Sequence, residues 1–243
     1  MIYNSEERIG GSYMIKNSVK IPVSFLILVA LCFSCVSSAS TVKTMDGDSL
    51  VARNSGREKD KILIIDVRPE AEYRAGHIEN AINMLSDTIA DNLAAIEPWK
   101  NMPIIVYCNT GKRSAAAAEV LTKNGFKEVY NAAGVKEHEY NLVTHTDILP
   151  ADLLKMQQDP NTILVDYRPQ DQYAAGHLEG AINIPWGEIQ NNLDKLPKEK
   201  NIVLYCNTGT KSLEGAKELS TLGYEHVFNA IFGVKEYRYT LVK

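Results

Sequence analysis

Two cysteines stand at the same place in a phrase that occurs twice in this sequence. Cys108 follows the apolar run 103–107 and precedes Asn-Thr-Gly-Lys-Arg-Ser, and Cys206 follows the apolar run 202–205 and precedes Asn-Thr-Gly-Thr-Lys-Ser. Each run is short and rich in β-branched residues, which is typical of a strand buried on both faces, and a helical pattern follows each loop. We therefore expect each thiol at the carboxyl end of a strand, just before a helix.

That position favours a reactive thiolate. Backbone N–H groups of a tight loop, the positive end of the helix dipole and the charge of Arg113 all stabilise a negative sulfur. A single cysteine beside a strand is explained equally well as a small buried apolar side chain. The second copy of the phrase makes chemistry the better explanation. We predict Cys108 and Cys206 as catalytic nucleophiles, and the rest of each loop as substrate-binding: Asn109, Thr110, Gly111, Lys112, Arg113, Ser114, Asn207, Thr208, Gly209, Thr210, Lys211 and Ser212.

The sequence contains two similar copies of one unit. Residues 62–69 (ILIIDVRP) recur 100 residues later as TILVDYRP, and residues 75–83 (AGHIENAIN) recur at the same spacing as AGHLEGAIN. A period of this size indicates a duplicated domain, since solenoid repeats are roughly 20 to 50 residues long. We predict a first domain over residues 45–143 and a second over residues 144–243, each with its own core.

Strand and helix patterns alternate within each copy. In the first copy we expect strands at 62–66, 81–83, 103–107 and 128–131, and helices at 69–75, 88–96, 113–124 and 135–140. Residues 49–52 and 149–157 also have helical patterns. This alternation predicts an α/β fold in which a mostly parallel sheet is flanked by helices on both faces. Ligands of such sheets bind beyond the carboxyl ends of the strands, where both cysteines are expected.

Composition excludes some classes of partner. The 243 residues carry a formal net charge of −4, and the sequence pI is about 5.8. The chain therefore lacks the excess of basic residues that is typical of a nucleic-acid-binding surface. The five histidines are scattered, and no Cys-x-x-Cys pair or glycine-rich nucleotide motif is present after residue 39, so we expect neither a metal site nor a cofactor.

The first 39 residues have the layout of a secretory signal peptide. Lys16 and Lys20 precede the apolar run 21–33, and small residues follow, with a cleavage site after Ala39. We therefore expect export, to the periplasm. Two alternatives stay open, namely lipid attachment at Cys35 and an uncleaved anchor. In either case this N-terminal segment is the one contact with a membrane that the sequence suggests. Met14 is also a plausible start, because the charged region begins there.

Five ordered motifs, each present twice over residues 45–243, resemble the rhodanese family: Asp-x-Arg-Pro, Ala-Gly-His-Ile/Leu, Ala-Ile-Asn, Tyr-Cys-Asn-Thr-Gly and a final Gly-Val block. The resemblance implies a sulfurtransferase without a cofactor. Its cysteine takes the outer sulfur from a small anion such as thiosulfate or polysulfide, and a thiol or cyanide then accepts that sulfur. The second copy departs from the pattern, with Lys211 in place of Arg113, and we expect Cys206 to be weaker or matched to another donor.

His77 and His177 invite a role as catalytic bases, but they lie far upstream of the cysteines and have no evident partners, so we predict a structural role. Asp66 with Arg68, and Asp166 with Arg168, are predicted to pair and fix the turn after a strand.

Three other functions also depend on a cysteine loop or on this fold. A phosphatase or arsenate reductase on the same fold has five residues between cysteine and arginine, whereas four stand here. Thiol–disulfide exchange lacks a resolving cysteine near either loop. A non-catalytic binding or sulfur-carrier module is not excluded for the second copy.

Overall fold

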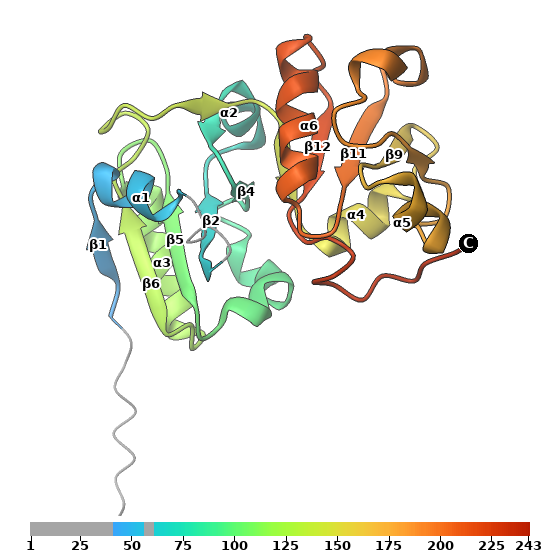
Figure 1. Cartoon of the computed structure of the whole chain (residues 1–243). Helices are drawn as coiled ribbons and strands as arrows, with labels where there is room; N and C mark the ends of the chain where they lie inside the picture. The colour runs from blue at the N-terminus through green and yellow to red at the C-terminus, as the bar shows by residue number, and fades with distance from the viewer. Residues whose placement is uncertain (1–40, 56–60) are drawn as a thin grey trace, which may run out of the picture. The chain divides into compact units, whose positions relative to one another are not determined.

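The strands of the two copies line up in one parallel sheet. The computed structural model describes residues 41–55 and 61–243 (Figure 1). Within these residues the strand order is β1-β6-β5-β2-β4-β8-β12-β11-β9-β10, and each neighbouring pair is parallel. The first copy supplies β1 (Lys43–Met45), β2 (Leu63–Asp66), β4 (Ala81–Asn83), β5 (Pro103–Tyr107) and β6 (Glu128–Ala132). The second supplies β8 (Thr146–Ile148), β9 (Thr162–Asp166), β10 (Ile182–Asn183), β11 (Asn201–Tyr205) and β12 (Val227–Ala230).

Helices connect these strands. The first copy has α1 (Gly47–Arg53), α2 (Glu70–Ala75), the 3-10 helix η2 (Ile89–Trp99) and α3 (Lys112–Lys123). The second has α4 (Pro150–Met156), α5 (Gln170–Ala175), the 3-10 helix η3 (Gln190–Lys195) and α6 (Thr210–Thr221). A small antiparallel pair, β3 (His77–Ile78) with β7 (Leu142–Val143), lies outside the main sheet.

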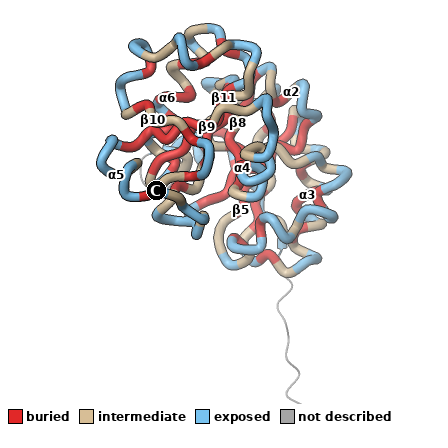
Figure 2. The backbone as a smooth tube through the Cα atoms, turned by 90° about the vertical axis from the view of Figure 1, so that its right-hand side faces the viewer, coloured by how far each residue is buried: buried red, intermediate tan, exposed pale blue. Residues whose placement is uncertain are grey.

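The strands are apolar on both faces because helices cover both. In β2, Leu63 and Ile65 belong to the core cluster beneath α3 and η2. Ile64 belongs instead to the cluster that contains Leu50 of α1 and Tyr73 of α2. Side chains of a strand alternate between faces, so a strand buried on both sides has an unbroken apolar sequence. Figure 2 shows buried residues concentrated along the strands.

The two copies meet where β4 pairs with β8, in register at Ile82 and Asp147. The backbone N–H of Asp147 also donates to the Tyr73 hydroxyl, with 3.2 Å between the two atoms. The described residues all fall within one compact unit. The predicted α/β class, with a mostly parallel sheet and helices on both faces, is confirmed.

Several predicted elements need correction. The helix predicted at 135–140 was wrong: this stretch forms turns. Its amides are used elsewhere, since Val135 N–H donates to the Cys108 carbonyl and Lys136 N–H to the Asn109 carbonyl. The helix predicted at 88–96 is the 3-10 helix η2, which contains Pro98. The short strands β1, β3, β7 and β8 were not predicted, because two or three residues are too few to show an alternation of apolar and polar side chains.

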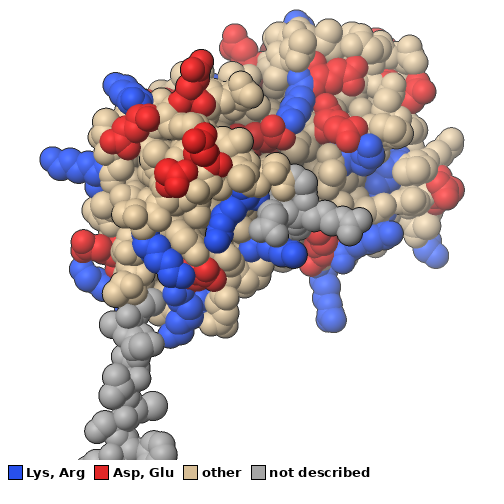
Figure 3. All heavy atoms as spheres, turned by 60° about the vertical axis from the view of Figure 1, so that its left-hand side comes forward, with Lys and Arg blue, Asp and Glu red and all other residues tan. Residues whose placement is uncertain are grey.

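The described residues also bear on the predictions about membrane contact and surface charge. None of the helices in residues 41–55 and 61–243 has the length and hydrophobicity that a membrane span requires. The signal peptide predicted at residues 1–39, with its alternatives at Cys35 and Met14, lies outside the described residues. On the face drawn in Figure 3, acidic and basic side chains are interspersed.

Candidate active site

Cys108 directly follows β5, and α3 begins four residues later. The loop between them can turn this sharply because Gly111 has a φ of 71°, a left-handed conformation that glycine adopts without strain. Only 1% of the Cys108 surface is exposed. The thiol therefore lies at the floor of a loop whose backbone N–H groups converge on it.

The loop stabilises the charged form of this thiol. Burial raises the pKa of Cys108, but hydrogen bonding from the side chain and backbone of Ser114 and from the backbone N–H groups of Thr110 and Arg113 outweighs burial and lowers it. The distance from Ser114 Oγ to Cys108 Sγ is 3.4 Å. A larger thiolate fraction at neutral pH makes Cys108 a candidate nucleophile.

The second loop repeats this geometry after β11. Gly209 has a φ of 73°, and Cys206 is 3% exposed. The backbone N–H of Ser212 donates to Cys206 Sγ over 3.5 Å, and Ser212 Oγ lies 3.4 Å from the same sulfur. Both cysteines are free thiols.

The repeated Gly-Val block closes the back of each loop. A side chain at Gly134 would collide with the carbonyl of Asn109, and one at Gly233 would collide with the backbone of Asn207. The following residue, Val135 or Val234, donates its N–H to the carbonyl of the cysteine over 3.0 Å. The block therefore needs glycine for close approach, and it holds the cysteine loop from behind.

A carboxylate that we had not predicted lies at the first loop. Asn109 Nδ2 donates to Glu72 over 2.7 Å, and Arg113 lies 3.5 Å from the same oxygen. The hydrogen bond from Asn109, together with the nearby Arg113, lowers the pKa of Glu72 against the opposing effect of burial. In the second copy, Gln172 takes the corresponding place and accepts from Asn207 Nδ2 over 2.9 Å. Glu72 and Gln172 stand 37 and 35 residues before the asparagines that they contact, and no local pattern in the sequence links them to the loops.

The two cationic residues differ in their surroundings. Arg113 is turned toward Glu72, whereas the Lys211 ammonium lies 2.9 Å from Glu214 and 3.8 Å from the centre of the Trp186 ring. Lysine also lacks the planar fork of arginine. The two loops therefore share a thiol cradle but present different charged groups at the rim.

The Rhodanese-like domain family matches residues 50–135 and 149–239 of this chain. The chain belongs to the rhodanese family. Its two matched segments make it a tandem rhodanese, and each carries one of the two cysteine loops.

Two curated relatives and one solved structure illustrate the similarity. "Thiosulfate sulfurtransferase PspE" of Escherichia coli (strain K12) is 38% identical over 73 residues, covering 30% of this chain and 70% of that protein. "Putative sulfur carrier protein YrkF" of Bacillus subtilis (strain 168) is 24% identical over 144 residues, covering 59% of this chain and 73% of that protein. The structure described as "rhodanese with anions from E. coli" is 35% identical, covers 34% of this chain and 98% of that one, and has a TM-score of 0.32.

The remaining loop residues of this tandem rhodanese line the rim. Thr110, Lys112, Thr208 and Lys211 are exposed, while Ser114 and Ser212 are buried beside the sulfur atoms. Thr208 Oγ1 lies 3.4 Å from Thr210 Oγ1 across the mouth of the second loop.

The predicted carboxylate–guanidinium pairs are present in both rhodanese copies. The Arg68 guanidinium donates to both oxygens of Asp66, with a shortest distance of 2.6 Å, and to the Gly76 carbonyl over 2.8 Å. Arg168 makes the same contacts with Asp166 and Gly176. Each pair ties the strand end to the end of the following helix.

His77 is buried and stacks on Tyr73, with 3.6 Å between ring centroids. Its Nδ1–H donates to the Tyr73 carbonyl over 3.0 Å. Burial lowers the pKa of His77 to about 4, so the ring is neutral near pH 7. Within the part of the chain that the structure describes, no cluster of three or more metal-ligating side chains is present.

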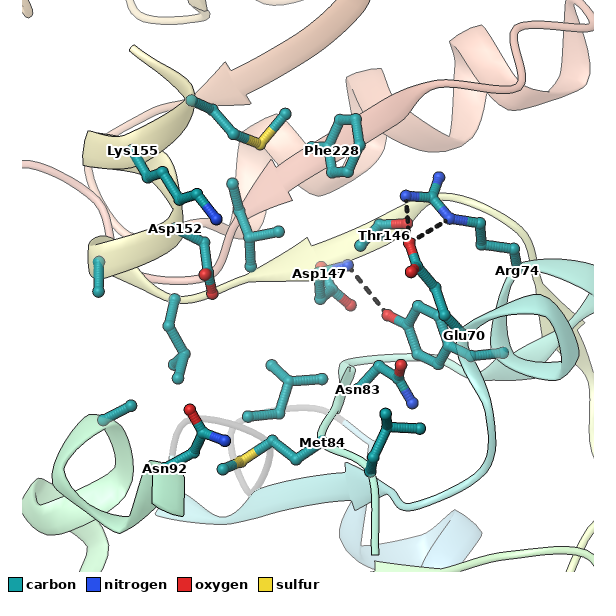
Figure 4. Close-up of a pocket in the computed structure, with 18 of the residues that line it drawn as sticks. Glu70, Arg74, Asn83, Met84, Asn92, Thr146, Asp147, Asp152, Lys155 and Phe228 are labelled. Carbon is teal, nitrogen blue, oxygen red and sulfur yellow. Dashed lines mark hydrogen bonds and ion pairs between the residues drawn. The ribbon is translucent and has the colours of Figure 1, made fainter. Parts of the chain in front are cut away.

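A separate cavity of about 980 Å³ lies at the junction of the two copies, beside the paired strands β4 and β8, and is lined in part by Asn83, Met84, Asp147, Asp152 and Phe228 (Figure 4). Its lining residues do not include either cysteine loop. The thiol cradles and this cavity are therefore different places in the molecule.

Proposed function

We propose that this tandem rhodanese is a sulfurtransferase that carries sulfur as a persulfide on Cys108. The observation that carries the proposal is a thiol of lowered pKa at the floor of a loop of converging backbone N–H groups. A thiolate there attacks the outer sulfur of a donor such as thiosulfate. The new Cys–S–S⁻ bond forms as the S–S bond of thiosulfate breaks, and sulfite leaves with the electron pair.

An acceptor then completes the cycle. A thiolate or cyanide attacks the outer sulfur of the persulfide, which yields a new persulfide or thiocyanate and returns Cys108 to its thiolate. The N–H groups of residues 109–114 bind the anionic persulfide, and Arg113 pairs with the oxyanion of the donor. The similarity to "Thiosulfate sulfurtransferase PspE" supports thiosulfate as the first donor to test.

The second copy supports two functions. Cys206 has the same cradle, which supports a second persulfide site, with residues 207–212 as its binding loop. Lys211 is engaged by Glu214 and Trp186, which favours the alternative of a sulfur carrier that docks a partner rather than a small anion. The similarity to "Putative sulfur carrier protein YrkF" agrees with this alternative.

Localisation and domain limits complete the proposal. We propose that residues 1–39 direct export to the periplasm, and that the two domains extend over residues 45–143 and 144–243. The partners are a small sulfur-containing anion and a thiol or cyanide acceptor.

Peptide-resolved mass spectrometry tests this function. The purified chain is incubated with thiosulfate, alkylated without reduction and digested with trypsin, which gives residues 101–112 with Cys108 and residues 201–211 with Cys206. We expect the first peptide to gain one sulfur atom and to lose it when cyanide is added. Cys108→Ser should abolish the gain, while Cys206→Ser, the matched control, leaves it.

The same experiment separates the alternatives. Sulfur on both peptides makes both copies active. If neither thiosulfate nor polysulfide loads either peptide, the sulfurtransferase proposal is wrong and a binding module is the better explanation. A phosphatase assay on the same preparation tests the rival hydrolase.

A further inference from the structure

The two cysteine loops differ in the partner of their buried serine. In the first copy, Ser114 Oγ lies 2.6 Å from Asn131 Oδ1. The amide of Asn131 is oriented by its other end, because Nδ2 donates to the Gly111 carbonyl over 3.1 Å. Oδ1 has no hydrogen of its own, so the hydrogen between the two atoms belongs to Ser114.

One hydroxyl hydrogen cannot serve two acceptors equally. Ser114 Oγ is also 3.4 Å from Cys108 Sγ, but the contact with Asn131 is much shorter. Turning the hydroxyl toward the sulfur would leave Asn131 Oδ1 without that donor. The Ser114 hydroxyl is therefore mainly engaged by Asn131, and the backbone N–H groups hold the Cys108 sulfur.

The second copy lacks this competition. Asn229 is the counterpart of Asn131, but its Nδ2 donates to Asp147 Oδ1 over 2.7 Å. Its own Oδ1 is buried and accepts no hydrogen bond within the described residues. Ser212 Oγ lies 3.0 Å from the Gly209 carbonyl and 3.4 Å from Cys206 Sγ. The Gly209 carbonyl also accepts from Leu213 N–H, so it stays bonded when the hydroxyl turns to a charged sulfur.

Asp147 is well placed to hold Asn229. In the sheet register Asp147 stands opposite Asn229, just as Thr44 stands opposite Asn131. Asp147 is 2% exposed, and its backbone is fixed by the Tyr73 hydroxyl, as Figure 4 shows. Burial raises the pKa of Asp147, but interactions with His145 and Asn229 outweigh burial and lower it, so the side chain is a carboxylate. An ionised acceptor binds an amide more strongly than a neutral one.

We propose that Asp147 is a positioning residue for Cys206: it holds the amide of Asn229 and so leaves the Ser212 hydroxyl free to donate to the sulfur. In the first copy, Asn131 takes the equivalent hydroxyl. The hydroxyl of Ser212 therefore contributes more to the thiolate of Cys206 than the hydroxyl of Ser114 contributes to that of Cys108. The inference rests on the proposed function only in taking the two cysteines as the sulfur-carrying residues.

The chain provides a crossed test. Ser114→Ala and Ser212→Ala are each alkylated with iodoacetamide across a pH series, and the tryptic peptides 101–112 and 201–211 report Cys108 and Cys206 separately. We expect Ser212→Ala to raise the pH midpoint of Cys206 alkylation by about one unit, which is about tenfold less thiolate near neutral pH. Ser114→Ala should change Cys108 less than about threefold. In each variant the loop that carries no substitution is the internal control.

Asp147→Thr tests the positioning role, because it introduces the residue of the first copy. Asn229 is then free to engage Ser212, so the Cys206 midpoint should rise toward that of the Ser212→Ala variant. An unchanged Cys108 profile shows that the fold is intact. If Asp147→Thr unfolds the protein, Asn131→Ala decides, since releasing Ser114 should lower the Cys108 midpoint.

Equal effects of the two serine variants, or none from Ser212→Ala, would overturn the proposal. The charged groups at the rims, among them Glu72, Arg113, Lys211 and Glu214, are the same in every variant. Because alkylation needs no sulfur donor, its outcome is independent of whether sulfur transfer occurs.

Discussion

His77 makes the folded protein sensitive to mild acid. The ring is buried against Tyr73, with Nδ1–H donated to a carbonyl, and Nε2 is buried without a partner within the described residues. Burial lowers the pKa of His77 from its ordinary 6.5 to about 4. Below pH 6.5 the His77 ring of the unfolded chain therefore binds a proton, whereas in the folded chain it binds one only near pH 4.

The size of the effect follows from that displacement. The unfolded state binds more protons in this window, so stability falls as the pH falls. Each unit by which the pKa of His77 is lowered corresponds to about 1.4 kcal/mol in the free energy of unfolding. The full lowering therefore corresponds to about 3 kcal/mol, of which about 2 kcal/mol is lost between pH 7 and pH 5. The carboxyl of Asp147, whose pKa is lowered, titrates below this window.

Urea unfolding of the wild type and of His77→Asn at pH 7 and pH 5 measures the contribution. The asparagine amide can still donate to the Tyr73 carbonyl, but it does not titrate. We expect the variant to be less stable at pH 7 and to lose about 2 kcal/mol less than the wild type on acidification. His177→Asn is the matched control, since His177 makes the same contact with Tyr173 but is less buried.

Parallel losses in wild type and His77→Asn would refute the reasoning. Persulfide formation by folded His77→Asn at pH 7.5 should equal that of the wild type, because a structural histidine takes no part in the chemistry. A large loss of turnover in the folded variant would instead support a catalytic base.

Two further substitutions test the first loop. Glu72→Gln should keep the Asn109 contact, as Gln172 does in the second copy, while removing a negative charge; we expect the second-order rate constant of Cys108 with thiosulfate to rise on the order of threefold at low salt. An uncharged sulfane donor should show no gain, and a gain with both donors would contradict the electrostatic explanation. Gly134→Ala places a methyl group against the Asn109 carbonyl, so we expect the alkylation rate of Cys108 to fall about tenfold or more while that of Cys206 is unchanged. Equal alkylation of Cys108 in this variant and in wild type would show that the loop does not depend on the close approach.

Local pattern alone predicted much of the architecture. The runs that became β2, β5 and β11 are uninterrupted and apolar, and this pattern has few structural solutions besides a strand covered on both faces. The repeated phrases predicted two copies.

For other elements, local pattern gave a wrong prediction or none. Residues 135–140 have a helical composition, but their backbone makes a single turn, in which Glu137 and His138 both donate their N–H groups to the Gly134 carbonyl. The strand β8 has three residues, too few for a period, and exists because β4 and β12 lie on either side of it. For β8, hydrogen bonds to strands distant in sequence made an element that the local sequence does not predict.

The sequence by itself determined the identity and place of both thiols, because a strand, a tight glycine turn and a helix are local features. It also determined that Asp66 and Arg68 would pair. Only the tertiary structure decided what surrounds each thiol. Glu72 comes from a helix 36 residues before Cys108, and Asp147 comes from β8 at the junction of the two copies. Such neighbours are set by the packing of strands and helices that the chain brings together, and one sequence carries no local signal of that packing.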